Sequence, residues 1–521
     1  MASRLATLLT LLVIAAVCAL PVLAGSALAT GSATTAPQPT PMASGMAHPT
    51  AAPTVSAPTP SAPNDSPFGI IGNLERNRKT QPSALKPYLQ SSDAAVQARA
   101  AIAIGRLHNP AGVPLLIAVL GGAYPESVRA AAAFGLGVIA SPNALDALHA
   151  AALHAPPAVA GPAADALGRI GGDAAVDVLT QLLYSRDAYM RGKAAIGLGL
   201  AGLTGKPEIT IARKTAIAKT LASVISGERN PETKWRLAWA IYRSYATTSG
   251  SVLRYMLTDN QELVRLMALK AIAKVKDRTF AVSVRLLAND PSWRVRVEVR
   301  NALDAMKDPT PVNLTQPPVP RDDQTEPKAL PSGAPIGDHP QVAIVANKGV
   351  IVVELFPDVA PYHVDAFLNL VDKGFYNGTT INRVIWDFVI QGGDPSNGKA
   401  NLPSGPGFNV PDEVNPVEQL TGMLALGLDY DNVKNTPIFD SAGSQYYITQ
   451  SPQLHLDEAF STFGRVVKGM AVVYAIQKHD PTDFKNPSDV VARMYRCEPV
   501  SLQTPEIEAQ LRTDEVHYNP Q

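Results

Sequence analysis

The part of the sequence richest in groups that could act on a substrate runs from Arg383 to Asp394. Within it an arginine, the aromatic ring of Phe388 and the amide of Gln391 follow one another at short spacing. Taken singly, each has an ordinary explanation: an isolated arginine usually lies at the surface or in an ion pair, and the Gly-Gly-Asp at the end of the block predicts a tight turn. The interpretation of this block therefore depends on what accompanies it.

The sequence does not indicate a metal centre or a cofactor site. Two cysteines, Cys18 and Cys497, are too few for a disulfide scaffold, a cysteine-based zinc site or an iron–sulfur cluster. The histidines show no metal-ligand spacing, since His149 and His154 are five residues apart on an expected helix. There is also no phosphate-loop or dinucleotide signature. We therefore expect neither a metal nor a cofactor.

Four motifs follow one another in the C-terminal region. They are Gly374-Phe-Tyr-Asn-Gly378, the Arg383-to-Asp394 block, Gly443-Ser-Gln-Tyr-Tyr-Ile-Thr449 and Phe463-Gly-Arg-Val-Val-Lys-Gly-Met470. In type and order they resemble the motifs of cyclophilins, which are peptidyl-prolyl cis–trans isomerases, over about residues 342–478. The resemblance implies a closed antiparallel β-barrel capped by two helices, and isomerase activity.

The physics of that reaction suits these residue types. Amide resonance holds an X–Pro bond planar behind a barrier of about 18–20 kcal/mol, so catalysis must favour the twisted amide over both planar forms. Twisting returns a lone pair to the proline nitrogen, where a fixed guanidinium can hydrogen-bond. The resemblance gives this role to Arg383 and makes Phe388 the floor of the proline pocket. It assigns substrate-backbone binding to Gln391 and Gln445, and further pocket positions to Val389, Gly427, Tyr447, Leu456 and Phe460.

Several pocket positions depart from the family's usual residues. Asn382 replaces a histidine, and Leu428 stands where an asparagine usually contacts the peptide backbone. His455 takes a position that is often tryptophan, Phe460 replaces a histidine, and an insertion of about residues 429–441 precedes the third motif. We expect activity with an altered substrate preference. The alternative is a catalytically weak, cyclophilin-like peptide-binding or scaffold protein whose repeats carry the main function.

The elements that must hold these residues begin at Val342. Two β-rich runs, 342–346 and 349–355, flank a turn at Asn347-Lys348-Gly349 and predict a hairpin. A helix is then expected to start between Asp358 and Pro361.

Upstream, the sequence repeats itself. Val-Arg or related pairs recur at steps close to 30 residues, apart from one step of 45, and Ala- and Leu-rich stretches with helical spacing follow them. The pattern resembles short HEAT-like repeats. It predicts an α-helical solenoid over residues 67–306, with an extended concave face for a protein partner. We interpret the recurring arginines mainly as braces between units, and otherwise as partner-binding groups: Arg99, Arg129, Arg191, Arg236, Arg265 and Arg296. The recurring glycines Gly137, Gly168 and Gly199 predict helix ends or close backbone approach.

The first 29 residues have the pattern of an export signal. Arg4 precedes an apolar run, and small residues surround Ala29. We expect a signal peptide over 1–29, cleaved near Ala29, and a periplasmic or secreted protein. The alternative is a membrane anchor through residues 5–24.

Two proline-rich segments complete the predicted organisation. Residues 30–66 are expected to be a disordered Pro/Ala/Thr-rich linker, and 307–340 a second linker. A cyclophilin-like domain is expected over 341–500 and a C-terminal tail over 501–521.

These features predict an exported prolyl isomerase that assists protein folding. Its partners would be proline-containing segments of unfolded or exported proteins, held near the pocket by the repeats. The 45 basic and 45 acidic residues cancel, which argues against nucleic-acid binding.

Overall fold

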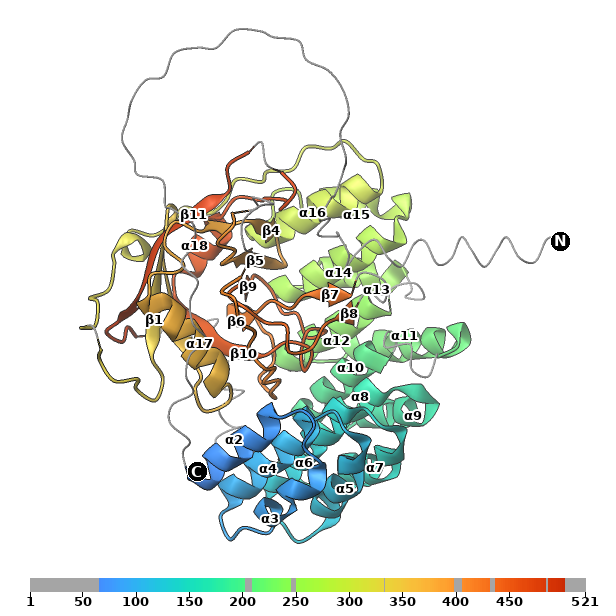
Figure 1. The fold of residues 1–521 in the computed structure, drawn as a ribbon. Helices are drawn as coiled ribbons and strands as arrows, with labels where there is room; N and C mark the ends of the chain where they lie inside the picture. The colour runs from blue at the N-terminus through green and yellow to red at the C-terminus, as the bar shows by residue number, and fades with distance from the viewer. Residues whose placement is uncertain are drawn as a thin grey trace, which may run out of the picture.

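The computed structural model describes residues 65–201, 209–244, 250–331, 333–397, 405–431, 436–483 and 486–501. An array of helices comes first in these ranges, and a region rich in β-strands follows it (Figure 1). The predicted signal peptide and most of the predicted first linker and tail lie outside the described residues. Within the described ranges, no helix is both long enough and apolar enough to cross a membrane.

The helical array runs from α2 to α16. Its main contacts join every second helix from α4 to α16, so these helices form one continuous layer. The α-helices are α2 (Pro67–Arg76), α3 (Lys86–Leu89), α4 (Ala94–Arg106), α5 (Val113–Gly121), α6 (Glu126–Ile139), α7 (Leu145–His154), α8 (Pro157–Ile170), α9 (Gly172–Leu182), α10 (Ala188–Ala201), α11 (Ile211–Ile225), α12 (Pro231–Arg243), α13 (Gly250–Leu257), α14 (Glu262–Val275), α15 (Ala281–Arg285) and α16 (Trp293–Ala305).

Short polar side chains start several of these helices. The Asn230 side chain accepts a hydrogen bond from the Thr233 N–H at the start of α12, where Pro231 occupies the first turn. Ser292 caps α16 in the same way through the Val295 N–H. These contacts satisfy donors that a helix start leaves without partners.

The recurring glycines lie within helices and allow those helices to approach closely. A Cβ on Gly168 of α8 would lie 2.5 Å from the Gly197 Cα of α10, and a Cβ on Gly199 would lie 2.4 Å from the Trp239 ring. Gly137 of α6 similarly faces the backbone of Ala166. The expected close approach is confirmed, whereas the expected helix ends are wrong, because α6, α8 and α10 continue past these positions.

Most of the recurring arginines brace neighbouring units, as expected. Arg265 Nη1 donates to the Asp259 carbonyl at 2.9 Å, and its Nε lies 2.9 Å from Asp290 Oδ2 in the next unit. Arg191 makes the matching pair of contacts with the Ser185 carbonyl and Glu228.

The second region is an antiparallel sheet with two α-helices. Its strand order is β3-β11-β1-β2-β10-β6-β9-β5-β4, and the short β7 and β8 form a separate pair. The predicted hairpin is confirmed as β1 and β2, which join at Gly349. The elements are β1 (Gln341–Ala346), β2 (Gly349–Leu355), α17 (Pro361–Asp372), β3 (Thr380–Ile381), β4 (Arg383–Ile385), β5 (Val389–Gly392), β6 (Met423–Leu426), β7 (Tyr430–Asp431), β8 (Thr436–Pro437), β9 (Tyr446–Thr449), β10 (Thr462–Lys468), α18 (Met470–Ala475) and β11 (Asp489–Cys497).

The two ends of this sheet are close together in the chain. Strands β3 and β4 stand at opposite ends of the strand order, although only Asn382 separates them in sequence. The sheet is therefore strongly curved around its apolar core, which includes Phe367, Tyr446 and Phe463. Closure into a barrel stays a prediction.

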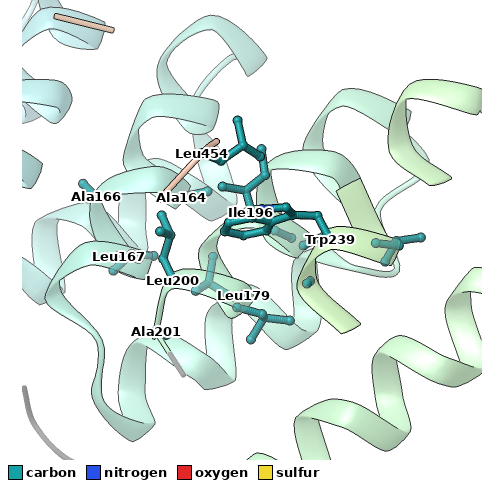
Figure 2. Close-up of a cluster of buried hydrophobic side chains, with 14 of the residues drawn as sticks. Ala164, Ala166, Leu167, Leu179, Ile196, Leu200, Ala201, Trp239 and Leu454 are labelled. Atoms are coloured by element: carbon teal, nitrogen blue, oxygen red, sulfur yellow. The ribbon is translucent and has the colours of Figure 1, made fainter. Parts of the chain in front are cut away.

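The sheet region is seated on the inner side of the curved helical array (Figure 1). Leu420, Met423 and Leu454 belong to the same buried apolar cluster as the repeat helices. Figure 2 shows Leu454 beside Ile196 and Trp239. The repeats were expected to offer this concave face to a separate partner. Much of it instead packs against the chain's own C-terminal region.

The segment 307–340 contacts both parts. Arg296 Nη2 donates to the Thr315 carbonyl, and Gln316 Nε2 donates to the Tyr474 carbonyl. Further along, Lys328 pairs with Glu498. This proline-rich segment therefore has fixed contacts with both parts of the chain.

Candidate active site

Strand register places Arg383 and Gln391 in one row with Tyr447. Arg383 of β4 pairs with Gln391 of β5, Gln391 pairs with Tyr447 of β9, and Tyr447 pairs with Ala425 of β6. Directly opposed residues in an antiparallel sheet point to the same face. Four strands therefore present these side chains side by side.

A chain of hydrogen bonds orients the polar part of this row. Arg383 Nη1 donates to Gln391 Oε1 at 3.2 Å, and Gln391 Nε2 donates to Gln445 Oε1 at 2.9 Å. The Arg383 guanidinium carbon also lies 5.9 Å from the centre of the Phe388 ring, within cation–π range. All four side chains are only partly buried, so a ligand can reach them.

The predicted apolar residues form a single cluster next to this row. Val389, Ala425, Tyr447 and Phe460 are its buried members, and Tyr447 and Phe460 meet edge-on with ring centres 5.8 Å apart. Partly buried side chains complete it: Phe388, Leu428, Leu456 and Ala459. The structure thus brings together every apolar pocket residue expected from the sequence.

The Gly427-Leu428 departure has a structural consequence. The Gly427 N–H donates to the Gln445 carbonyl at 2.8 Å, which fixes the backbone beside the polar row. A Cβ at Gly427 would lie 3.5 Å from Gln391 Nε2, an ordinary contact distance. Leu428 packs into the apolar cluster. This position therefore extends the apolar wall and offers a ligand no side-chain amide.

His455 lies against the pocket floor. Its ring stacks on Phe388 with centres 6.1 Å apart and an interplanar angle of 18°. Burial, together with the positive charges of Arg243, Lys270 and Lys274 on the repeat helices, lowers the pKa of His455 well below its ordinary value. The imidazole is therefore neutral at neutral pH and serves as a flat, weakly polar surface.

Two supporting residues carry no recognisable signal in the sequence. Gln419 Oε1 accepts a hydrogen bond from the Tyr447 hydroxyl at 2.7 Å. Gln450 Oε1 accepts one from the N–H of Asp387, the buried residue just before Phe388. Each partner is distant in sequence, so only the folded chain reveals the pair.

The predicted insertion forms the β7–β8 pair and reaches the helical array. Arg78 Nη2 lies 2.8 Å from Asp440 Oδ1 and donates to the Asp412 carbonyl at 2.7 Å. The His108 and Phe439 rings approach with centres 4.7 Å apart. The insertion thus connects the sheet region to the first repeats.

This arrangement suits the binding and twisting of a peptide. A guanidinium and two amides stand beside a cluster of apolar side chains from neighbouring strands. Such a site can hold a peptide backbone through hydrogen bonds while an apolar ring packs against the cluster.

Comparisons with known proteins match both parts of the chain. Residues 341–498 match the family described as cyclophilin type peptidyl-prolyl cis-trans isomerase/CLD. Residues 122–199 match HEAT repeats, and residues 96–122 match the PBS lyase HEAT-like repeat.

Similar proteins match this region over most of their own length. Peptidyl-prolyl cis-trans isomerase-like 1 of Mus musculus is 35% identical over 152 residues, which are 29% of this chain and 88% of the relative. A peptidyl-prolyl cis-trans isomerase of Synechococcus elongatus is 34% identical over 142 residues, 27% of this chain and 90% of the relative. The crystal structure of a cyclophilin type peptidyl-prolyl cis-trans isomerase from Cryptosporidium parvum is 25% identical with a TM-score of 0.26, and covers 31% of this chain and 99% of that one.

Proposed function

Because the chain belongs to the cyclophilin-type peptidyl-prolyl cis–trans isomerase family, we propose that it isomerises X–Pro bonds in exported proteins and thereby assists their folding. The isomerase domain and the HEAT repeats are parts of one chain. The compartment, the clients and the roles of individual residues are the proposal.

One observation carries the catalytic part of the proposal. The hydrogen-bonded row of Arg383, Gln391 and Gln445 runs beside the apolar cluster around Phe388. A substrate lying along the row would place its prolyl ring in the cluster and its backbone against the two amides.

The reaction then needs no bond to be made or broken. With the prolyl ring held, the preceding carbonyl rotates, and the proline nitrogen becomes pyramidal and basic as resonance is lost. Arg383 would donate to that nitrogen, an interaction available only in the twisted state. Because Gln391 already orients the guanidinium, little reorganisation is required.

The test is to replace Arg383 in the full chain. Arg383→Ala should lower kcat/KM on a proline tetrapeptide by about 100-fold or more, with unchanged circular dichroism. The matched control is Arg493→Ala, which removes a surface arginine paired with Glu326. Wild-type kcat/KM in folded Arg383→Ala would contradict the assignment.

A second function, a peptide-binding scaffold of low activity, is favoured by one observation. Leu428 gives the pocket an apolar wall where a backbone-binding amide is usual. Tight binding of a proline peptide without turnover in the wild-type protein would select this function.

Export rests on the N-terminal pattern of residues 1–29. We propose that the mature protein begins near Thr30, outside the cytoplasm. N-terminal sequencing of the fractionated protein tests this, and an intact Met1–Ala29 segment in the membrane fraction would favour an anchor.

We also propose that the curved sheet is a closed barrel. Besides the single residue between β3 and β4, a bridge between Thr380 and Asp394 supports closure, because it joins β3 to the residue two positions after β5.

A further inference from the structure

The turn that presents Phe388 has an unfavourable backbone conformation. The Phe388 N–H donates to the Ile385 carbonyl at 3.0 Å, which closes the turn, and Asp387 has a φ of 57°. A non-glycine residue in this left-handed region costs roughly 1–2 kcal/mol. The Asp387 side chain is also fully buried, with 0% exposure. Surrounding contacts must therefore hold both its backbone and its charge.

The principal holding contact comes from the helical array. Lys270 of α14 places its Nζ 2.7 Å from Asp387 Oδ2 and also donates to the Asp387 carbonyl at 3.1 Å. The Lys270 side chain is itself largely buried, with 14% exposure. One ammonium group thus neutralises the buried carboxylate and fixes the backbone of the same residue.

A second repeat helix supports the turn from its other side. Arg294 Nη1 of α16 donates to the Gln450 carbonyl at 3.0 Å. Gln450 in turn uses its N–H to donate to the Phe388 carbonyl and its side-chain oxygen to accept from the Asp387 N–H, both at 2.8 Å. Ser451 Oγ donates to the Asp387 carbonyl at 2.7 Å. The turn is therefore bonded to the array directly and through one intermediate residue.

These contacts extend to the pocket within one residue. Phe388 adjoins Asp387, lies beneath the Arg383 guanidinium and stacks on His455. A shift of the turn would move the aromatic ring relative to the guanidinium. In a site whose rate depends on orientation, a displacement of about 1 Å can cost on the order of 100-fold in rate.

We propose that Lys270 is a positioning residue for the isomerase: by binding Asp387 it holds Phe388 in place, so the HEAT array is part of the catalytic unit. The proposal rests on the isomerase function proposed above. It gives the repeats a role that needs no external partner.

The test compares full-length variants with the wild type. Lys270→Met keeps the length and the packing of the side chain but removes its charge, which leaves Asp387 buried and unpaired. We expect kcat/KM on a tetrapeptide to fall about 10- to 100-fold. Lys270→Arg, which keeps the charge, should recover much of the loss.

The double variant Lys270→Met/Asp387→Asn separates positioning from general stability. Because Asp387→Asn removes the carboxylate that Lys270→Met leaves unpaired, the double variant should be more active than Lys270→Met alone, and with Asp387→Asn as the second single variant the two substitutions should be non-additive. If Lys270→Met fails to fold, a second double variant, Lys270→Arg/Asp387→Asn, is compared with Lys270→Met/Asp387→Asn instead. The control is Arg78→Met, which removes another interface cation whose contacts with the sheet region are with Asp412 and Asp440. It should keep wild-type kcat/KM even if its melting temperature falls.

The outcomes distinguish this proposal from the one it rests on. An inactive wild type would overturn both. An active wild type that loses activity with Arg383→Ala, beside a folded Lys270→Met of unchanged kcat/KM, would overturn only the positioning role. Equal losses in Lys270→Met and Arg78→Met would also overturn it, because interface stability alone would then explain the effect.

Discussion

Two carboxyl groups and one ammonium group are buried together next to Phe388. Asp387 comes from the sheet region, whereas Glu298 of α16 and Lys270 of α14 come from the repeats. Burial raises the pKa of Glu298 to about 7, Lys270 opposes the shift, and the negative charge and hydrogen bond of Asp387 reinforce it. At acidic to neutral pH Glu298 therefore carries a proton, and Lys270 then has only the charge of Asp387 to balance.

This pKa shift predicts a pH-dependent stability. Below about pH 4.5 Glu298 is protonated in the folded and unfolded states, and between there and about pH 7 only the folded state keeps the proton. The free energy of unfolding should therefore fall as pH rises through this window, by roughly 3 kcal/mol at most, and level off above it. Glu298→Gln supplies a permanent neutral donor and should remove this loss. Urea unfolding at pH 5, 6, 7 and 8 measures it.

The comparison needs a control glutamate and a clear contrary outcome. Glu326→Gln, at the surface pair with Arg493, should leave the pH profile of stability unchanged. Parallel profiles for Glu298→Gln and the wild type would show that Glu298 is not the responsible group.

At the scale of elements, small residues decide how closely the repeat helices pack. Helix propensity alone favours Gly168→Ala by about 1 kcal/mol. The contact opposes it, because the new Cβ would lie 2.5 Å from the Gly197 Cα, and backbone atoms cannot rotate away. Overpacking costs typically 1–3 kcal/mol. We expect Gly168→Ala to lower the free energy of unfolding, measured by urea titration.

Gly121, the last residue of α5, is the matched control. A Cβ there would meet nothing within 4 Å. Gly121→Ala should therefore be neutral or slightly stabilising. If Gly168→Ala stabilised the protein as much as Gly121→Ala, the close approach of α8 and α10 would not be limiting.

The elements also show what a sequence can and cannot predict here. The side chains of Arg383, Gln391 and Tyr447 were predictable as one site because their strands carry recognisable motifs and pair directly. Lys270 and Asp387 are 117 residues apart and belong to no shared motif. Their pairing depends on how the whole array sits against the sheet, which helical periodicity does not specify. The same reason explains why the concave face was expected to be open.

At the scale of the whole molecule, the net charge is balanced, but the charges at the contact between the two parts are separated by sign. Cations of the array face carboxylates and carbonyl oxygens of the sheet region; they are Arg78, Arg106, Arg169, Lys193, Arg236, Lys270 and Arg294. Buried ion pairs stabilise weakly after desolvation but strongly disfavour mismatched arrangements. We therefore expect the shared apolar cluster to supply most of the docking free energy, and the charges to fix the relative position of the two parts.

Glu418 is the clearest place to test whether the two parts behave as one. Its Oε1 lies 2.7 Å from Lys193 Nζ and its Oε2 lies 2.7 Å from Arg236 Nη2, and these cations outweigh burial to lower its pKa to about 2. Its contribution to stability should therefore be present above about pH 4.5 and be lost as pH falls toward 2.

Glu418→Arg should undock the sheet region at neutral pH, because it places a third cation between two that have lost their acid. The wild type should unfold in one calorimetric transition, and Glu418→Arg in two, with a larger radius of gyration in solution scattering. Its kcat/KM should also fall, since undocking removes Lys270 from Asp387. Glu326→Arg, which reverses a charge paired with Arg493 away from this interface, controls for charge reversal itself. A single transition and an unchanged radius of gyration in Glu418→Arg would mean that the apolar contacts alone hold the two parts together. The ion pairs between the array and the sheet region would then not be needed for their assembly.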